Sequence, residues 1–401
     1  MSVDPHRWIT LAVVLTATFM GLLDTFIVNV SVPSIQRDLH AGFAEVQFVL
    51  AGYTLAYAIV LTTGGRLGDL YGRKLLFLAG MAGFILASAF CGFASNPAFL
   101  IVFRVIQGVM AALMLPQVLS IIQVSFLPKE RGLALGLYGA TVGAAAILGQ
   151  VVGGLLITAN FLGLGWRPIF LVNVPLGLVA FVATLLLLRE SHAPGSNELD
   201  LVGMGLVSVG LFLLVYPLVE SRIAAWPWWL VLCLILSLLV LATFALYEHW
   251  LTRHGHTPLV ALSLFGRRAF TVGILMVLTL YGSSAGFFLV FAYYLQEGLR
   301  FSALSAGLTF LPMGIGFFLA SATASRLVPK LGRGVLTLGV FTTITQIANA
   351  LGVAVIGLIF ANVVGRNGAY AHGFAISLLV ILALGMLLFL CVFFLPSKRT
   401  Q

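Results

Sequence analysis

The chain has 401 residues, of which 61% are hydrophobic and only 8% are charged. Soluble globular domains have about 45–50% apolar and about 25% charged residues, so this composition excludes that class and indicates a polytopic membrane protein. The formal net charge of +9 follows from the membrane topology described below, and we assign no nucleic-acid partner.

Intervals without Asp, Glu, Lys or Arg mark the expected membrane spans. When the first two intervals are merged across Asp24, twelve segments remain, and each is long enough to cross about 30 Å of hydrocarbon. In chain order they cover 8–36, 46–65, 75–103, 105–128, 132–166, 168–188, 201–219, 223–247, 269–296, 301–325, 334–365 and 367–397. The sequence therefore predicts an all-α polytopic membrane protein.

The basic residues lie mostly on one side of these spans. With the N-terminus in the cytoplasm, the opposite side carries only Arg37, Arg167, Arg222, Arg300 and Arg366. Cytoplasmic loops of membrane proteins are enriched in lysine and arginine. We therefore expect a multi-pass protein of the cytoplasmic membrane with both termini in the cytoplasm.

Two charged side chains lie deep inside apolar spans. Asp24 interrupts the first span, where an ionised carboxylate costs about 2.5–3.5 kcal/mol, so we expect it to face a cavity and to exchange a proton. Arg104 lies in the fourth span and stays charged, so it needs carbonyls, water or a carboxylate partner. We expect Arg104 to approach Asp24 in one conformation and to leave it in another. A static structural ion pair is the alternative.

A glycine-rich charged stretch, GGRLGDLYGRK (64–74), separates the second and third spans. Its glycines are expected to permit a tight turn and close backbone approach. Asp69 is expected to accept hydrogen bonds from a helix N-terminus or to pair with a basic residue across an interface between halves. A hairpin without a switching role is the alternative. The defining residues of this loop motif are Gly65, Gly68, Asp69, Gly72, Arg73 and Lys74.

The fifth span carries small residues at helical spacing, a pattern that allows helices to approach closely. The residues of this glycine motif are Gly143, Gly149, Gln150, Gly153 and Gly154.

A weaker echo of the loop motif, SRLVPKLGR (325–333), suggests two related halves, as is common in transporters. The echo has Pro329 where the loop motif has Asp69. Since the loop motif follows the second span of its half, the second half is predicted to begin near Ala269. The predicted division is a six-helix N-terminal half (1–190), a linker with two inserted helices (191–268) and a four-helix C-terminal half (269–401).

Five stretches together resemble the major facilitator superfamily, specifically its drug/proton antiporter branch with fourteen helices. The loop motif GRLGDLYGRK (65–74) resembles the superfamily motif between the second and third helices. The other four resemble motifs of the first, fourth, fifth and sixth helices: LLDTFIVNVSVPSI (22–35), FRVIQGVMAALMLP (103–116), GAAAILGQVVGG (143–154) and WRPIFLVNVPLG (166–177). The resemblance implies a major-facilitator-type helical bundle, with about 12 helices here arranged as six, two inserted and four.

The resemblance also implies roles for individual residues. It implicates Asp24 in proton coupling, in which we expect Arg104 to take part as its partner, and it implies that the loop motif latches the outward-facing state. The glycine motif is expected to limit leakage in antiporters, with helix packing alone as the alternative, and Gln150 stands where many members have proline. Thr25, Asn29 and Gln107 are candidates for the substrate cavity.

The C-terminal half departs from the family pattern. From about Thr342, the stretch 334–360 resembles a helix that normally comes two positions later. An internal loss of about two helices explains this departure.

Three functions remain open at this stage. The first is a proton-coupled secondary transporter that exports drug-like or amphipathic small molecules. The alternatives are a transport-inactive truncated member or membrane interaction protein, and a proton-coupled metabolite carrier. We expect no enzyme activity because no span carries a catalytic constellation, and no cofactor because no phosphate loop occurs. The histidines 249, 254 and 256 lie in a basic loop, and we predict no metal site. The expected partners are a small-molecule substrate and the lipid bilayer, and we expect a monomer.

Overall fold

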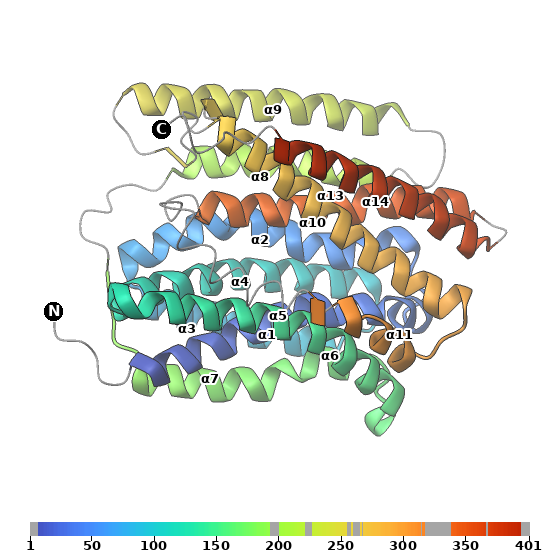
Figure 1. The fold of residues 1–401 in the computed structure, drawn as a ribbon, viewed down its shortest axis with the longest axis horizontal. Coiled ribbons are helices and arrows are strands. Elements are labelled where there is room, and N and C mark those ends of the chain that lie inside the picture. Colours follow the sequence, from blue (N-terminus) through green and yellow to red (C-terminus); the bar gives the residue numbers. More distant parts are fainter. Residues whose placement is uncertain are drawn as a thin grey trace.

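The computed structural model describes residues 7–192, 200–220, 227–254, 258–259, 265–266, 268–313, 315–316, 338–365 and 368–393. Every regular element in these ranges is helical (Figure 1). The echo motif at 325–333, His256 and residues 193–199 of the predicted linker (191–268) lie outside the described residues.

Six spans form the N-terminal part of the bundle. They are α1 (Arg7–Asp38), α2 (Phe43–Tyr71), α3 (Arg73–Gly92), α4 (Pro97–Ser125), α5 (Pro128–Ala159) and a sixth span interrupted at Val172, which consists of α6 (Pro168–Leu171) and α7 (Asn173–Leu187). A short 3-10 turn, η1 (Phe161–Gly163), precedes the sixth span.

The later helices begin with the pair α8 (Leu201–Glu220) and α9 (Trp228–Arg253). They continue with α10 (Arg268–Tyr293), its π-helical extension η3 (Tyr294–Gly298), α11 (Ala303–Thr309), α13 (Leu338–Val364) and α14 (Tyr370–Phe393). Among the described residues, eleven helices are long and apolar enough to cross a membrane, and Ala303–Met313 is a shorter apolar helix in the expected span at 301–325.

Glycines allow the helices to cross at backbone distance. A Cβ atom on Gly64 would overlap the carbonyl oxygen of Ala112, so α2 and α4 touch without an intervening side chain. A Cβ atom on Gly352 would likewise overlap the carbonyl oxygen of Gly282, where α13 crosses α10. These crossings use small residues in the way that is typical of membrane helices.

The described residues contain two large apolar cores that differ in which helices they join. We call the two ends of the bundle the Arg7 end and the Asp38 end, after the first and last residues of α1. The core nearer the Arg7 end consists of residues from the first six spans alone, from Leu11 to Leu188. The core nearer the Asp38 end also includes side chains of α8, α10 and α13. The N-terminal six spans and the later helices therefore share an apolar core at the Asp38 end.

Polar contacts join the same parts of the chain near the Asp38 end. Gln47 Nε2 of α2 donates to the carbonyl of Val353 in α13 at 2.9 Å. The backbone N–H of Leu304 at the start of α11 donates to Thr158 Oγ1 of α5 at 3.1 Å. Two helix pairs, α2 with α13 and α5 with α11, thus connect the N-terminal spans to the later helices.

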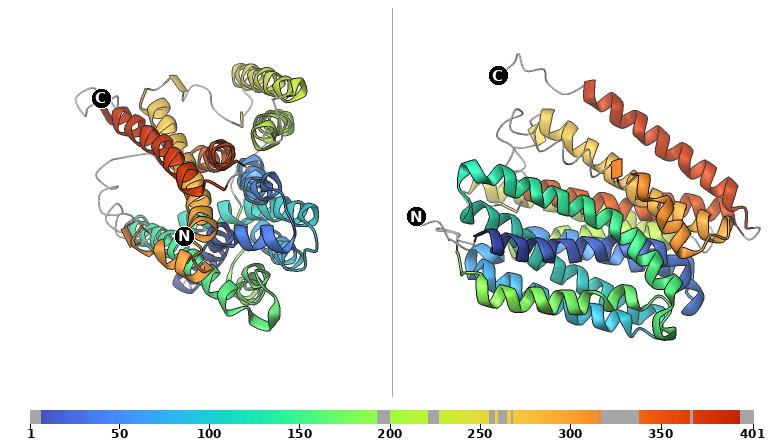
Figure 2. Two further views of the ribbon diagram at one scale, coloured as in Figure 1. Left: turned by 90° about the vertical axis from the view of Figure 1, so that its right-hand side faces the viewer. Right: turned by 60° about the horizontal axis from the view of Figure 1, so that its bottom comes forward.

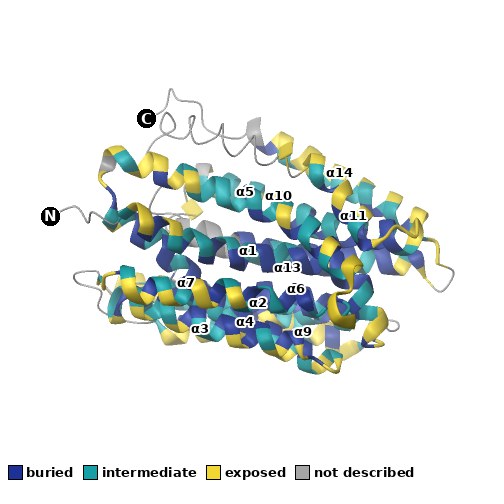
Figure 3. Cartoon of the chain, turned by 90° about the horizontal axis from the view of Figure 1, so that it is seen from below, coloured by how far each residue is buried: buried dark blue, intermediate teal, exposed yellow. Residues whose placement is uncertain are grey.

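Helices α9 and α14 lie at the edge of the bundle (Figure 2). In the most apolar 18-residue stretch of each of these two helices, only 11% of the residues are buried, against 67% in α2. Exposed residues follow much of α14 (Figure 3). In a membrane these apolar faces contact lipid.

Candidate functional site

Asp24 and Arg104 form a buried ion pair between α1 and α4. Arg104 Nη1 donates to Asp24 Oδ2 at 2.5 Å, and the two side chains are 1% and 0% exposed. Asp24 was expected to face a cavity, but protein groups enclose its carboxylate. A buried charge is tolerated when it is paired and hydrogen-bonded, and this geometry meets both conditions.

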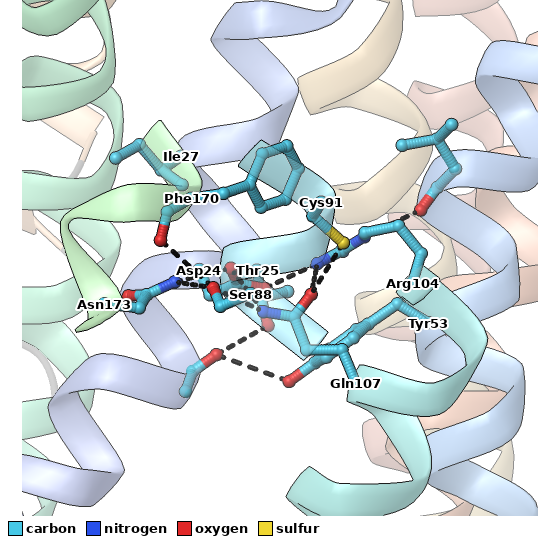
Figure 4. Close-up of polar contacts among 12 residues, drawn as sticks. Asp24, Thr25, Ile27, Tyr53, Ser88, Cys91, Arg104, Gln107, Phe170 and Asn173 are labelled. Atoms are coloured by element: carbon cyan, nitrogen blue, oxygen red, sulfur yellow. Dashed lines mark hydrogen bonds and ion pairs between the residues drawn. The ribbon is translucent and has the colours of Figure 1, made fainter. Parts of the chain in front are cut away.

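Two amide side chains complete the hydrogen bonding of the Asp24 carboxylate (Figure 4). Gln107 Nε2 and Asn173 Nδ2 donate to Asp24 Oδ1 at 3.0 and 2.8 Å. The same two nitrogens donate to Ser88 Oγ at 3.1 and 2.9 Å. Because Ser88 Oγ accepts from both amides, its own hydrogen is donated to the carbonyl of Phe170, at 3.1 Å. The carboxylate therefore accepts three hydrogen bonds in a closed network.

The guanidinium group of Arg104 also lies between aromatic rings. Its Cζ atom is 4.3 Å from the centroid of the Tyr53 ring and 5.7 Å from that of Phe170. Its Nε donates to the carbonyl of Val49 at 3.1 Å, and Nη1 donates to Gln107 Oε1 at 2.8 Å. Desolvated cation–π contacts contribute about 2 kcal/mol. The cation is thus stabilised by groups other than a carboxylate.

Local sequence explains how the helices supply these groups. Positions 104 and 107 are three residues apart and share one face of α4. The interruption at Val172, between α6 and α7, brings both the Phe170 carbonyl and the Asn173 side chain to the network. Ser88 and Asn173 were not among the predicted site residues.

The predicted cavity residues take other positions. Thr25 Oγ1 and Asn29 Nδ2 bond to carbonyls of their own helix, at 3.0 and 3.3 Å, and Gln107 belongs to the buried network. A depression of about 530 Å³ opens at the Asp38 end, and it is lined by Gln36, Arg37, His40, Ala41, Glu297 and Tyr370.

The loop motif at 65–74 is mostly helical. Helix α2 continues to Tyr71, and Gly72, with a φ of 114°, is the single residue between α2 and α3. Gly65 and Gly68 therefore lie inside a helix. The tight turn depends on Gly72 alone, since this φ lies in the region that favours glycine.

Asp69 pairs within the loop motif. Its Oδ1 accepts from Arg73 Nη2 at 2.7 Å and from Nε at 3.0 Å, because the turn at Gly72 brings the start of α3 next to the end of α2. This differs from the expected pairing with another half or with a helix N-terminus. Glu190 caps α3 instead, and its two carboxylate oxygens accept from the backbone N–H groups of Lys74 and Leu75 at 2.9 and 3.1 Å.

Replacement of Glu190 by alanine is expected to weaken this cap. Loss of an N-terminal capping side chain costs about 0.5–2 kcal/mol, so the midpoint of thermal unfolding should fall. The Glu190→Gln variant keeps one acceptor oxygen and should lose less. Tryptophan fluorescence of the purified chain measures both, and equal midpoints for wild type and Glu190→Ala would show that the cap adds no stability.

The glycine motif of α5 lies between two helices. Gly149 and Gly153 pack on α1, Gly154 packs on the backbone of α11, and Gly143 is buried. Gln150 is 1% exposed, and neither of its amide atoms has a hydrogen-bond partner among the described residues. Close packing is therefore observed, whereas sealing against leakage stays a prediction.

The eleven spans and the buried charged network define a multi-pass membrane protein of the helical-bundle class. The family profile described as Major Facilitator Superfamily matches residues 14–400. The chain belongs to this superfamily.

Two curated relatives are transport or resistance proteins. The chain is 40% identical over 356 residues to the "Probable actinorhodin transporter" of Streptomyces coelicolor, which covers 86% of this chain and 61% of the relative. It is 37% identical over 326 residues to the tetracenomycin C resistance and export protein of Streptomyces glaucescens, covering 80% of this chain and 58% of the relative. The chain thus spans about three fifths of the length of the curated relatives it matches.

A solved structure shares the fold. A bacterial homologue of the human lysosomal transporter Spinster, in an inward-facing and occupied conformation, is similar with a TM-score of 0.57 and 18% identity. The similarity covers 100% of this chain and 98% of that structure.

Proposed function

We propose that this protein is a proton-coupled secondary transporter that exports drug-like or amphipathic small molecules across the cytoplasmic membrane. It is a carrier and not an enzyme, it uses the proton gradient without a cofactor, and it acts as a monomer. The observation that carries the proposal is the Asp24–Arg104 pair, fully buried among apolar spans at 2.5 Å. Intramembrane ionisable groups of this kind mark proton relays and transport pathways. The names of the relatives, an actinorhodin transporter and a tetracenomycin C export protein, support export of small organic compounds.

The loss of two helices from the C-terminal half is also part of the proposal. In this description, residues 1–190 form the complete half, 191–268 contribute α8 and α9, and 269–401 form the shortened half. The packing of α13 on both α10 and α2 supports a folded C-terminal part. A transport-inactive remnant and a metabolite carrier are the competing functions, and proton-driven efflux of a panel of dyes from everted vesicles separates them.

Transport requires the Asp38 end to open. With both termini in the cytoplasm, as the basic residues favour, the Asp38 end faces outward, and the contacts gathered there close the outer side. Alternating access then separates α5 from α11 and α2 from α13 on that side.

A disulfide between Thr158→Cys and Leu304→Cys is expected to hold the outer side closed. The Thr158 side chain lies 3.1 Å from the backbone nitrogen of Leu304, so cysteines at these positions should meet on oxidation. We expect dye efflux to fall more than about tenfold and to recover on reduction. A disulfide that raises the free-energy barrier to opening by more than about 1.4 kcal/mol slows transport by at least this factor. Each single cysteine variant should be insensitive to oxidant. Full efflux with the disulfide formed would show that this contact does not open during transport.

A further inference from the structure

The Asn173 side chain uses only half of its hydrogen-bonding capacity. Its Nδ2 donates to Asp24 Oδ1 at 2.8 Å and to Ser88 Oγ at 2.9 Å. Its Oδ1 is buried without a hydrogen-bond partner among the residues that the structure describes, and Asn173 is 0% exposed. A buried amide oxygen without a donor is uncommon and carries a desolvation cost. The amide therefore has an unused acceptor directly beside the proton-coupling carboxylate.

The network suits only one protonation state of Asp24. All three of its partners, Arg104, Gln107 and Asn173, are donors, and donors favour the ionised carboxylate. Proton uptake forms one O–H bond on Asp24 and removes its charge, and the new hydroxyl then needs an acceptor. The amide oxygen of Gln107, Oε1, is not available to accept from this hydroxyl, because it already accepts from Arg104. The free Oδ1 of Asn173 is an acceptor that a half-turn of the amide brings to Asp24.

We infer that Asn173 is a positioning residue of the proton site: its amide donates to ionised Asp24 and, after a half-turn, accepts from protonated Asp24. The inference rests on the proposed proton coupling at Asp24. Each orientation of the Asn173 amide then serves one protonation state of Asp24. The half-turn also removes one of the two hydrogen bonds that Ser88 accepts, so proton uptake is felt at α3 as well as at α1.

Three other titratable or charged groups face this site. They are Arg104 of α4, Tyr53 of α2 and Cys91 of α3, whose Sγ lies 3.9 Å from Gln107 Oε1. The described parts of α6, α7 and α11 contain no titratable residue. On α5 and α10, which also pack on α1, the titratable residues are Lys129, Glu130, Arg131, Tyr138, Arg268, Tyr281 and Tyr293. None of these seven hydrogen-bonds to Asp24 in the described structure.

Infrared difference spectra of the purified full chain in liposomes, recorded across a pH titration, test the inference. The carbonyl band of a protonated carboxyl group that disappears in Asp24→Asn belongs to Asp24. In Asn173→Leu, which has a similar volume, this band should appear at a pH about 0.5–1 unit higher, a three- to tenfold gain in proton affinity. The shift is upward because the lost bond to the ionised form is charge-assisted and stronger than the lost bond to the neutral form. The band should also move to the frequency of an acid without a hydrogen-bonded hydroxyl.

Two further variants complete the test. Asn173→Asp keeps the shape of the side chain if the leucine variant does not fold, and its second carboxylate beside Asp24 should raise the pH of proton uptake further. Asn349→Leu removes an amide of α13 that donates to Gln346 on the same helix, and Asp24 should titrate in this variant as in wild type. If Asp24→Asn leaves the band in place, the proposed proton site is wrong. If Asp24→Asn removes the band but both Asn173 variants titrate as wild type, Asn173 has a structural role alone and the present inference is overturned.

Discussion

Proton-driven efflux is expected to stop when Asp24 is replaced by asparagine. Asparagine has nearly the shape of aspartate but takes up no proton, so the gradient no longer acts on transport. One proton that crosses 100 mV supplies about 2.3 kcal/mol, enough for about fortyfold accumulation from the electrical term. In energised everted vesicles, wild type should accumulate an exported dye up to about fortyfold, and Asp24→Asn should not accumulate it. Dye fluorescence measures this accumulation.

The chain offers a matched control on the same helix. Asp38 also pairs with an arginine, Arg167, at 2.8 Å, but the Asp38 side chain is 46% exposed. Exposed ion pairs contribute about 0–1 kcal/mol. Asp38→Asn should therefore leave efflux within about twofold of wild type. The Asp24→Asn protein should still fold, since Arg104 keeps the Val49 carbonyl and the Tyr53 ring. Gradient-driven efflux at the wild-type level by Asp24→Asn would exclude proton coupling at this residue.

A single methyl group at Gly352 is expected to disrupt the crossing of α10 and α13. A Cβ atom there would overlap the carbonyl oxygen, the carbonyl carbon and the Cα atom of Gly282. These are backbone atoms, which cannot change rotamer to relieve the overlap. The helices must separate, and overpacking of this kind costs about 1–3 kcal/mol or more. We expect Gly352→Ala to give a lower unfolding midpoint and less folded protein by size-exclusion fluorescence.

Gly273→Ala is the matched control for this crossing. It adds the same methyl group to α10 at a position where no atom of the described residues lies within 4 Å of the new Cβ. There the helix gains about 0.5–1 kcal/mol from the better helix former, so stability should stay or rise. Equal midpoints for the two variants would mean that α13 does not pack on α10 as described, and the proposed shortened half would lose its main support.

The two charged members of the site could be predicted because they are conspicuous in the sequence. Asp24 and Arg104 interrupt apolar spans, and each needs a partner for its charge, so their mutual contact follows from the cost of burying charge. Ser88 and Asn173 gave no such signal. Serine and asparagine are inexpensive in a span, and only the packing of α3 and α7 on α4 and α1 brings them to the carboxylate.

The loop motif shows a second limit of sequence patterns. Glycines at 65 and 68 predicted a turn, but both lie within α2. At Gly68 the small residue makes room for the Gln117 side chain of α4, which a Cβ atom would overlap. Asp69 was expected to pair with a residue in the other half or with a helix N-terminus. It pairs instead with Arg73, four residues later in the same motif. The N-terminus of α3 is capped by Glu190, which is far away in the sequence. No local sequence pattern indicates this cap.

The all-helical architecture followed directly from apolar length, since unpaired backbone groups are not tolerated in lipid. Eleven of the twelve expected spans are long apolar helices among the described residues, and the expected span at 301–325 contains a shorter one. The glycine crossing of α10 and α13 was not predicted, because a glycine in a span looks the same whether it faces a helix or lipid. The order of six, two and four helices rests on the echo at 325–333, which lies outside the described residues.

In the proposed proton coupling, the aromatic enclosure of Arg104 affects which helix contact weakens when Asp24 takes up a proton. When Asp24 is neutralised, the cation remains fixed between the Tyr53 and Phe170 rings, so α2, α4 and α6 stay joined through it. The electrostatic attraction that is lost is the one that holds α1. Helix α1 also packs on α5, α10 and α11. In the proposed transport cycle, neutralisation therefore weakens the attachment of α1 to α4, and α1 is one of the helices that contact the later part of the chain.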